Sequence, residues 1–207
     1  MLSKAELEII SLFRRNIFLK ASIRELYKKL GSKSYQRAYE AVKKLQKEEF
    51  LNIDKRGHSN FTSLVINEKS ISLLSFLEEQ EAFRKKIPHT GKLLAIKETS
   101  QFLIIITGSY ARGKATKKSD IDLVIVIPDK ENPVHLQKLV ENLALLWHPP
   151  VHLYIFKKKD FLEMLLSKGE NYGKEIFKNH IVLKNSRIYY EILKEAIEHG
   201  FSNKSLY

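Results

Sequence analysis

Two aspartates and a Gly-Ser pair dominate the chemistry that this sequence can perform. Gly108 and Ser109 end a run of β-branched apolar residues, and Asp120 and Asp122 open a second such run. Side chains two residues apart on a strand point to the same face, so both carboxylates are expected to face the Gly-Ser turn. Magnesium prefers oxygen ligands and is commonly held by one or two carboxylates together with substrate phosphates. The spacing therefore predicts a site for a divalent cation and a phosphate.

The connection between the two runs has residue types that suit a phosphate. Glycine lets the backbone approach an anion closely, and a turn that leads into a helix directs free N–H groups at it. Nucleotidyl transfer depends mainly on positioning and on neutralising charge, so few other groups are required. The expected nucleotide-binding residues are Gly108, Ser109, Arg112, Lys114 and Ser119. Asp-x-Asp alone is a weak signal, because such pairs also arise by chance at strand edges and in turns.

The segments GSYARG and SDIDL resemble the DNA polymerase β-like nucleotidyltransferase superfamily, in which a hydrophobic strand, Gly-Ser or Gly-Gly, and Asp-x-Asp follow in order. The similarity is greatest to the small prokaryotic group of minimal nucleotidyltransferases, and it covers residues 92 to 185. It implies a small mixed sheet flanked by helices. It also implies that Asp120 and Asp122 hold Mg²⁺, with Mn²⁺ as the alternative, and that a nucleoside triphosphate, ATP in the first instance, is the substrate.

His152 departs from the pattern of that superfamily. The resemblance implies a third carboxylate on a later strand, and the matching position in the expected strand Val151 to Phe156 holds His152. Imidazole suits Mn²⁺ or Zn²⁺ better than Mg²⁺. His152 could act as the general base, because an imidazole group titrates near neutral pH. Alternatively, it is an ordinary half-exposed strand residue. The departure bears on catalytic rate more than on nucleotide binding.

Composition limits the class of protein. The chain has 207 residues, of which 43% are hydrophobic, which is enough for one large domain or two small ones. It has no cysteine, which excludes disulfides and thiolate metal sites. The sequence shows neither a membrane-spanning apolar run nor an apolar signal peptide, so a soluble, cytoplasmic protein is expected.

Positive charge is concentrated near the N-terminus. The net charge is +12, and residues 1–67 contain 14 Lys and Arg against 7 Asp and Glu. This bias favours an anionic partner, most often nucleic acid. A solvated charged surface is the alternative.

The same 67 residues carry signals of helices followed by a hairpin. Ser-x-x-Glu capping boxes at Ser3 and Ser22 begin two helices, and Ser34 begins a third. Two alternating runs around residues 54–60 then predict a hairpin. This order resembles a winged helix-turn-helix domain, which implies DNA contacts from the third helix and the wing. The expected DNA-binding residues are Lys33, Ser34, Gln36, Arg37, Lys44, Lys55, Arg56 and His58. Such domains also serve in protein docking or dimerisation.

We therefore expect an α/β (α+β) protein with a winged helix-turn-helix domain at 1–67, a connecting helix and linker at 68–90, and a nucleotidyltransferase-like domain at 91–207. The expected function is metal-dependent transfer of a nucleotidyl group to an unknown acceptor, which could be a protein, with Asp120, Asp122 and His152 as the catalytic residues. Two alternatives stay open. One is a DNA-binding regulator whose second domain senses nucleotide without turnover, and the other is an antitoxin-like module with a toxin partner. A homodimer is also compatible with the sequence.

Overall fold

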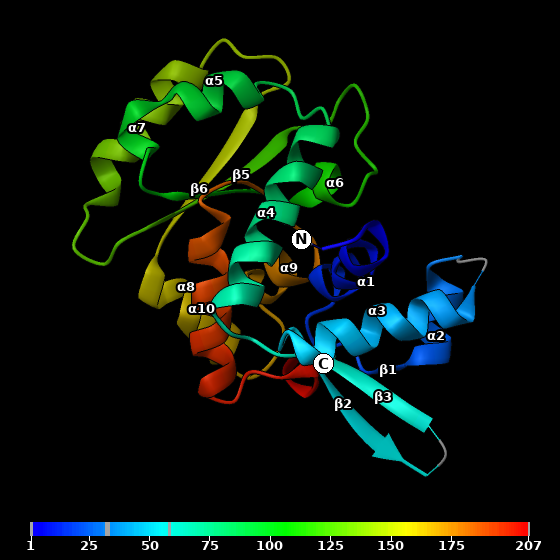
Figure 1. The fold of residues 1–207 in the computed structure, drawn as a ribbon. Helices are drawn as coiled ribbons and strands as arrows, with labels where there is room; N and C mark the ends of the chain where they lie inside the picture. The colour runs from blue at the N-terminus through cyan, green and yellow to red at the C-terminus, as the bar shows by residue number, and fades with distance from the viewer. Residues whose placement is uncertain (1, 32–33, 58, 207) are drawn as a thin grey trace. The chain divides into compact units, whose positions relative to one another are not determined.

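The computed structural model describes residues 2–31, 34–57 and 59–206, coloured along the chain in Figure 1. The chain separates into two compact units, Met1–Leu77 and Glu78–Tyr207. The boundary lies inside helix α4 (Glu68–Arg84), so one continuous helix contributes residues to both units. The mixed α/β fold class is as predicted. In the described part of the chain, no helix combines the length and the apolar character needed to cross a bilayer.

Before α4, the described residues of the first unit form three helices and a small antiparallel sheet. Its elements are α1 (Lys4–Arg15), β1 (Ala21–Ser22), α2 (Ile23–Lys29), α3 (Tyr35–Lys47), β2 (Leu51–Arg56) and β3 (Ser59–Leu64). The strand order is β1-β3-β2, with both pairs antiparallel. The fully buried apolar side chains include Ile9, Ile10, Phe13, Leu26, Val42 and Leu45. The expected order of three helices and a hairpin is therefore present in this unit.

Both predicted capping boxes start helices. At α1, the Glu6 backbone N–H donates to Ser3 Oγ (3.4 Å) and the Ser3 backbone N–H donates to the Glu6 carboxylate (3.0 Å). Ser22 and Glu25 make the same reciprocal pair at α2. Ser34 caps α3 by accepting from the Arg37 N–H. The serines fix these helix starts because each one satisfies a backbone N–H that has no partner within its helix.

The second unit is built around a four-stranded mixed sheet. After the end of α4 its elements are α5 (Thr90–Ala95), β4 (Leu103–Ile106), α6 (Gly108–Ala111), β5 (Ile121–Ile127), α7 (Pro133–Ala144), β6 (Val151–Lys157), α8 (Lys158–Leu166), α9 (Tyr172–Lys178), β7 (Ile181–Lys184) and α10 (Ser186–Glu198), with short 3₁₀ turns at Lys97–Thr99 and Asn203–Leu206. The strand order is β6-β5-β4-β7. Strands β5 and β6 are parallel, and the other pairs are antiparallel.

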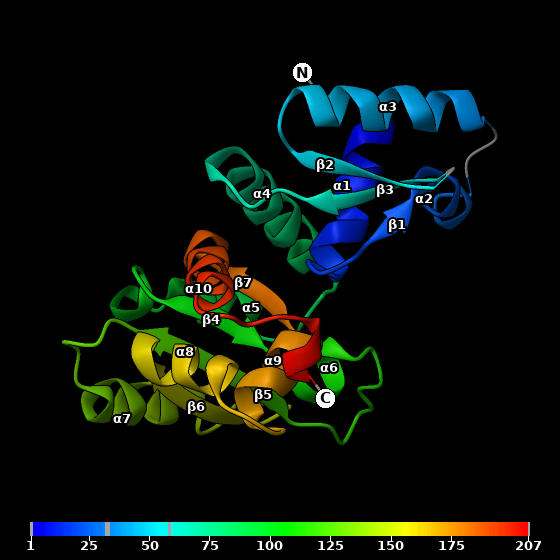
Figure 2. The same ribbon diagram turned by 90° about the horizontal axis from the view of Figure 1, so that it is seen from below.

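The sheet has a helix layer on each face. Alternate β5 residues Ile121, Leu123 and Ile125 join an apolar cluster with Leu136 and Val140 of α7. The residues between them face the other side, where α8 and α10 contact the sheet. Figures 1 and 2 show α8, α9 and α10 gathered on the side opposite α5 and α7. Asp122 of β5 and its register partner His152 of β6 lie on this second face.

Two features of the strands differ from the expectations. Strand β5 begins at Ile121, so Asp120 precedes the strand. The two-residue strand β1 was not predicted, because its sequence is also the start of a capped helix and carries no alternation of its own.

Candidate functional site

Parallel pairing of β5 with β6 brings Asp122 beside His152. The two residues are register partners, and His152 Nδ1 lies 3.8 Å from Asp122 Oδ1. The Asp122 side chain is 28% exposed and that of His152 is 62% exposed, so the pair lies where solvent and a ligand can reach it. The structure thus brings together the aspartate and the histidine that the sequence assigned to one site from positions thirty residues apart.

Gly108 packs directly against the Asp122 carboxylate. It is buried and has a positive φ of 64°, a conformation that glycine adopts without strain. A Cβ at this position would overlap Asp122 Oδ2. The neighbouring Thr107 N–H donates to the Asp122 carbonyl (2.9 Å), which fixes the turn against the strand. The glycine is therefore required by the carboxylate beside it as well as by its backbone angle.

Burial and acidic neighbours disfavour ionisation of Asp122. Burial raises the pKa of Asp122, and the charges of Asp120 and Glu175 raise it further, while those of His152 and Arg112 act in the opposite direction. The net pKa shift is upward. A divalent cation beside this carboxylate would relieve the repulsion, and aspartate oxygens are donors that Mg²⁺ and Mn²⁺ accept. The donor chemistry of Asp120 and Asp122 therefore fits such a cation.

The described residues contain no group of three His, Asp or Glu side chains spaced to hold a metal ion. The two aspartates are accordingly a partial donor set. Asp120 is exposed and lies at the end of the loop that joins α6 to β5. Protein sites for Mg²⁺ often rely on one or two carboxylates and take the remaining ligands from substrate and water.

The expected phosphate-binding residues lie in and after α6. Lys114 is exposed, and its N–H donates to the Ser109 carbonyl (2.9 Å). The Ser119 hydroxyl accepts from the Thr116 N–H (2.9 Å), so this side chain holds the loop in shape. Arg112, the residue that ends α6, donates from Nη1 to Glu175 Oε1 on α9 at 3.0 Å. The arginine expected to contact a phosphate thus forms an ion pair with a carboxylate.

Two residues of α9 belong to this region and were not predicted. Glu175 reaches it through Arg112, and Tyr172 lies with its ring centroid 4.8 Å from that of Tyr154 on β6. The Tyr154 hydroxyl lies 3.3 Å from His152 Nδ1, which links the aromatic pair to the histidine. Burial raises the pKa of Tyr172, and the neighbouring Tyr154 hydroxyl and the charges of Asp122 and Glu175 add to the shift, so its hydroxyl stays protonated.

Of the DNA-binding residues predicted on α3, two are exposed and Lys44 forms an ion pair with another helix. Gln36 and Arg37 are exposed, and Gln36 Nε2 donates to Glu40 Oε1 (2.9 Å). Lys44 is partly buried and its Nζ lies 3.0 Å from Glu6 Oε2, so it ties α3 to α1. On strand β2, Lys55 is exposed. The predicted residues Lys33 and His58 lie outside the described residues, as does the side chain of Arg56.

Comparison with known proteins finds a family match, and it lies within the second unit. No curated protein and no solved structure matches the chain. The β4–α6–β5 arrangement, with Gly108 against Asp122, lies within a region that a family model does match. This match supports nucleotidyl transfer as the general activity of the region at the level of the family. Residues 92–190 match the family described as the nucleotidyltransferase domain.

Proposed function

We propose that the second unit transfers a nucleotidyl group from a nucleoside triphosphate, with ATP as the first donor to test, to an acceptor that carries a nucleophile such as a hydroxyl. The acceptor oxygen forms a bond to the α-phosphorus, and the bond from that phosphorus to the oxygen shared with the β-phosphate breaks. Pyrophosphate leaves, and the acceptor proton passes to a base. His152 is the assigned base, because it is exposed and lies beside Asp122.

Asp120 and Asp122 would hold a divalent cation, Mg²⁺ or Mn²⁺, which when bound neutralises charge that develops on the transferred phosphate. Gly108 and Ser109 would let the backbone approach the triphosphate closely. Arg112 and Lys114 would supply positive charge, and Ser119 would hold the loop that carries Lys114. The observation that carries this assignment is the half-buried Asp122 carboxylate packed against Gly108, inside the region that matches the nucleotidyltransferase family.

Incubation of the protein with ATP labelled at the α-phosphate, Mg²⁺ or Mn²⁺, and a cell extract tests this function. A labelled macromolecule is the expected result. The double variant Asp120→Asn/Asp122→Asn should lose both transfer and metal-dependent nucleotide binding while keeping its fold by circular dichroism. Unchanged nucleotide affinity in that variant would exclude these residues as the site.

His152 favours a second candidate function, a regulator that binds nucleotide without turnover. An imidazole stands in the position where a catalytic carboxylate is expected, and it is a poor ligand for Mg²⁺. Comparing wild type with His152→Asp and His152→Ala separates the two functions. If His152 limits catalysis, His152→Asp should raise Mg²⁺-dependent transfer. Brisk transfer in wild type that His152→Ala leaves intact would make His152 a bystander.

We also propose that α3 and the hairpin of the first unit bind duplex DNA. Gln36 and Arg37 are exposed on α3, and Lys55 is exposed on β2. Lysine and arginine contacts to phosphates release counterions, so affinity should fall with salt and each lost contact should reduce the slope by about 0.9. Arg37→Ala with Lys55→Ala should weaken binding and flatten the salt dependence.

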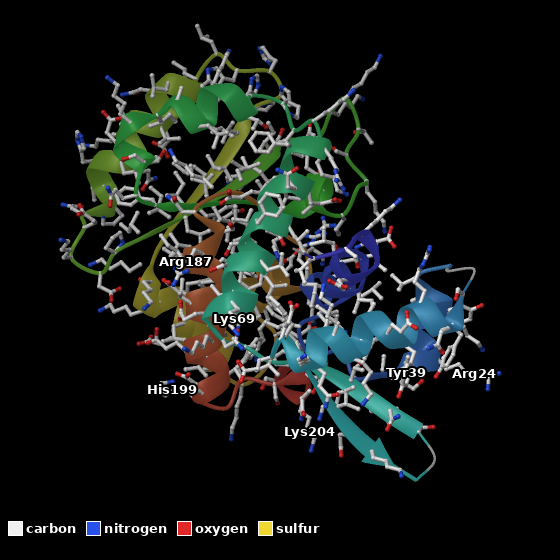
Figure 3. All side chains as sticks on the ribbon, in the orientation of Figure 1. Arg24, Tyr39, Lys69, Arg187, His199 and Lys204 are labelled. Carbon is white, nitrogen blue, oxygen red and sulfur yellow. The ribbon has the colours of Figure 1, made fainter. Side chains whose placement is uncertain are left out.

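Arg187→Ala with Lys204→Ala is a charge-matched control for that measurement, because it also removes two positive charges and both residues are exposed on the second unit. Arg187 lies on α10 of the second unit, where it pairs with Glu191 at 2.8 Å, and its position is labelled in Figure 3. This variant should bind DNA as wild type does. Equal loss in both variants would indicate attraction by overall charge, and no binding to duplex at low salt would favour a docking role for the first unit.

A further inference from the structure

The cation site lacks a third carboxylate at the strand position where one is expected. His152 occupies that position, and the described residues offer no group of three acidic or histidine side chains spaced for a metal. A donor that completes the site would therefore have to come from another element or from another side-chain conformation.

Glu175 of α9 is a carboxylate beside this site. Its negative charge contributes to the raised pKa of Asp122, and its Oε1 accepts from Arg112 Nη1 at 3.0 Å. The side chain is 48% exposed, so it can change rotamer without disturbing a core. Glutamate oxygen is a hard donor of the kind that Mg²⁺ and Mn²⁺ prefer.

The backbone that carries Glu175 is held firmly. Asn171 caps α9 by accepting from the Lys174 N–H, and the buried Lys174 ammonium donates to the Ser167 and Gly169 carbonyls at the end of α8. Gly173 packs so closely against α8 that a Cβ there would collide with Met164. The helix is thus fixed against α8, and Glu175 can move only through its own side-chain torsions.

Arg112 is the group that now holds Glu175. It caps the C-terminus of α6, three residues after Ser109, and guanidinium groups bind both phosphate and carboxylate in a bidentate manner. A triphosphate in the proposed site would compete for Arg112, and the released Glu175 would face a cation that also needs an oxygen ligand.

We propose that Glu175 supplies the third carboxylate of the cation site and that Arg112 holds it aside until a triphosphate binds the arginine. This inference rests on the proposed function, because it assumes that Asp120 and Asp122 bind the cation. It makes cation binding and nucleotide binding mutually dependent through one ion pair. The Arg112–Glu175 ion pair is then formed when the site is empty and broken when the triphosphate and the cation are bound.

Manganese binding, measured by calorimetry with and without the non-transferable analogue α,β-methylene-ATP, tests this role apart from activity. With the analogue, Glu175→Gln should weaken Mn²⁺ binding by about tenfold or more, the usual scale for losing a supporting group at a metal site. Glu170→Gln is the matched control, because Glu170 is an exposed carboxylate near α9 that pairs with Lys178 at 3.2 Å. It should bind Mn²⁺ as wild type does.

Without the analogue, Arg112→Gln should strengthen Mn²⁺ binding, because it frees Glu175, and Arg112→Gln/Glu175→Gln should lose that gain. Wild-type Mn²⁺ affinity in Glu175→Gln with the analogue, together with a loss in Asp120→Asn/Asp122→Asn, would overturn the role of Glu175 and leave the proposed function standing. Wild-type affinity in the double aspartate variant as well would overturn both.

Discussion

Gly108 shows how a single residue joins the fold to the proposed chemistry. Its positive φ is a conformation that costs other residues about 1–2 kcal/mol, and its missing Cβ leaves room for the Asp122 carboxylate. Gly113, five residues later, has a nearly identical φ of 66° but no atom within 4 Å of the Cβ it would carry. Comparing substitutions at the two glycines therefore distinguishes the free-energy cost of backbone strain from that of contact with the Asp122 carboxylate.

Gly113→Ala should lower the free energy of unfolding by about 1–2 kcal/mol, which is the strain alone, and should leave Mn²⁺ binding intact. Gly108→Ala should cost that amount and about 1–3 kcal/mol more, because the new methyl group must displace Asp122. It should also weaken Mn²⁺ binding. Thermal unfolding and calorimetry measure both effects. Equal stability loss in the two variants would show that the carboxylate moves aside without cost.

Asp122 should oppose folding at neutral pH in the absence of metal. When folding raises the pKa of a carboxyl group, ionisation of that group destabilises the folded state. Asp122→Asn should therefore raise the melting temperature at pH 7. The gain should shrink as pH falls through the raised pKa and vanish below about 3.8, the ordinary value, where the carboxyl is protonated in both states. A variant less stable than wild type at pH 7 would contradict the raised pKa.

At the scale of elements, signals that lie within a few residues predicted the most. The Ser-x-x-Glu boxes at Ser3 and Ser22 set helix starts, and the family resemblance assigned His152 to the site of Asp122, where the structure pairs the two residues in register. The contacts of α9 follow from packing between distant segments, so no local pattern points to Glu175 or Tyr172. Lys44 illustrates the same limit, because its helical position predicts an outward side chain while Glu6 on α1 engages it.

Glu6 connects the cap of α1 to α3 and should make the first unit sensitive to acid. Burial alone would raise the pKa of Glu6, but hydrogen bonds from Ser3 and Lys44 outweigh it and hold the pKa below its ordinary 4.5. Such a group stabilises the fold above pH 4.5, and the contribution is lost as pH falls through the lowered pKa. Glu6→Gln should lower the free energy of unfolding by about 1–3 kcal/mol at pH 7.

Wild type and Glu6→Gln should converge in stability well below pH 4.5, where Glu6 itself is protonated. Denaturant unfolding at several pH values measures this difference. Ser205→Ala is a control that removes a hydrogen bond but no ionisable group. It lies in the other unit, where Ser205 Oγ accepts from the Ser202 N–H (3.1 Å). A gap between Glu6→Gln and wild type that stays constant with pH would assign the effect of Glu6 to packing.

The whole molecule consists of two units that share one helix. Residues of α4 before the boundary, such as Ile71 and Leu74, are fully buried, and so is Glu78 just after it, where the Tyr190 hydroxyl donates to its carboxylate (3.2 Å). Each unit has its own buried core and its own sheet. Cooperative unfolding usually follows such compact units, because the contacts within one core are lost together.

Scanning calorimetry of the full chain should therefore resolve two transitions. Glu6→Gln should lower the melting temperature of the first unit alone, and Asp122→Asn should raise that of the second alone, because Glu6 pairs with Lys44 of the first unit and Asp122 with His152 of the second. Duplex DNA should then raise only the melting temperature of the first unit, which Glu6→Gln lowers. Mn²⁺ with α,β-methylene-ATP should raise only that of the second unit, which Asp122→Asn raises, because a ligand stabilises the unit that binds it. If either variant moves both transitions, the shared helix α4 couples the units into one cooperative structure, and binding at one unit would then be felt at the other.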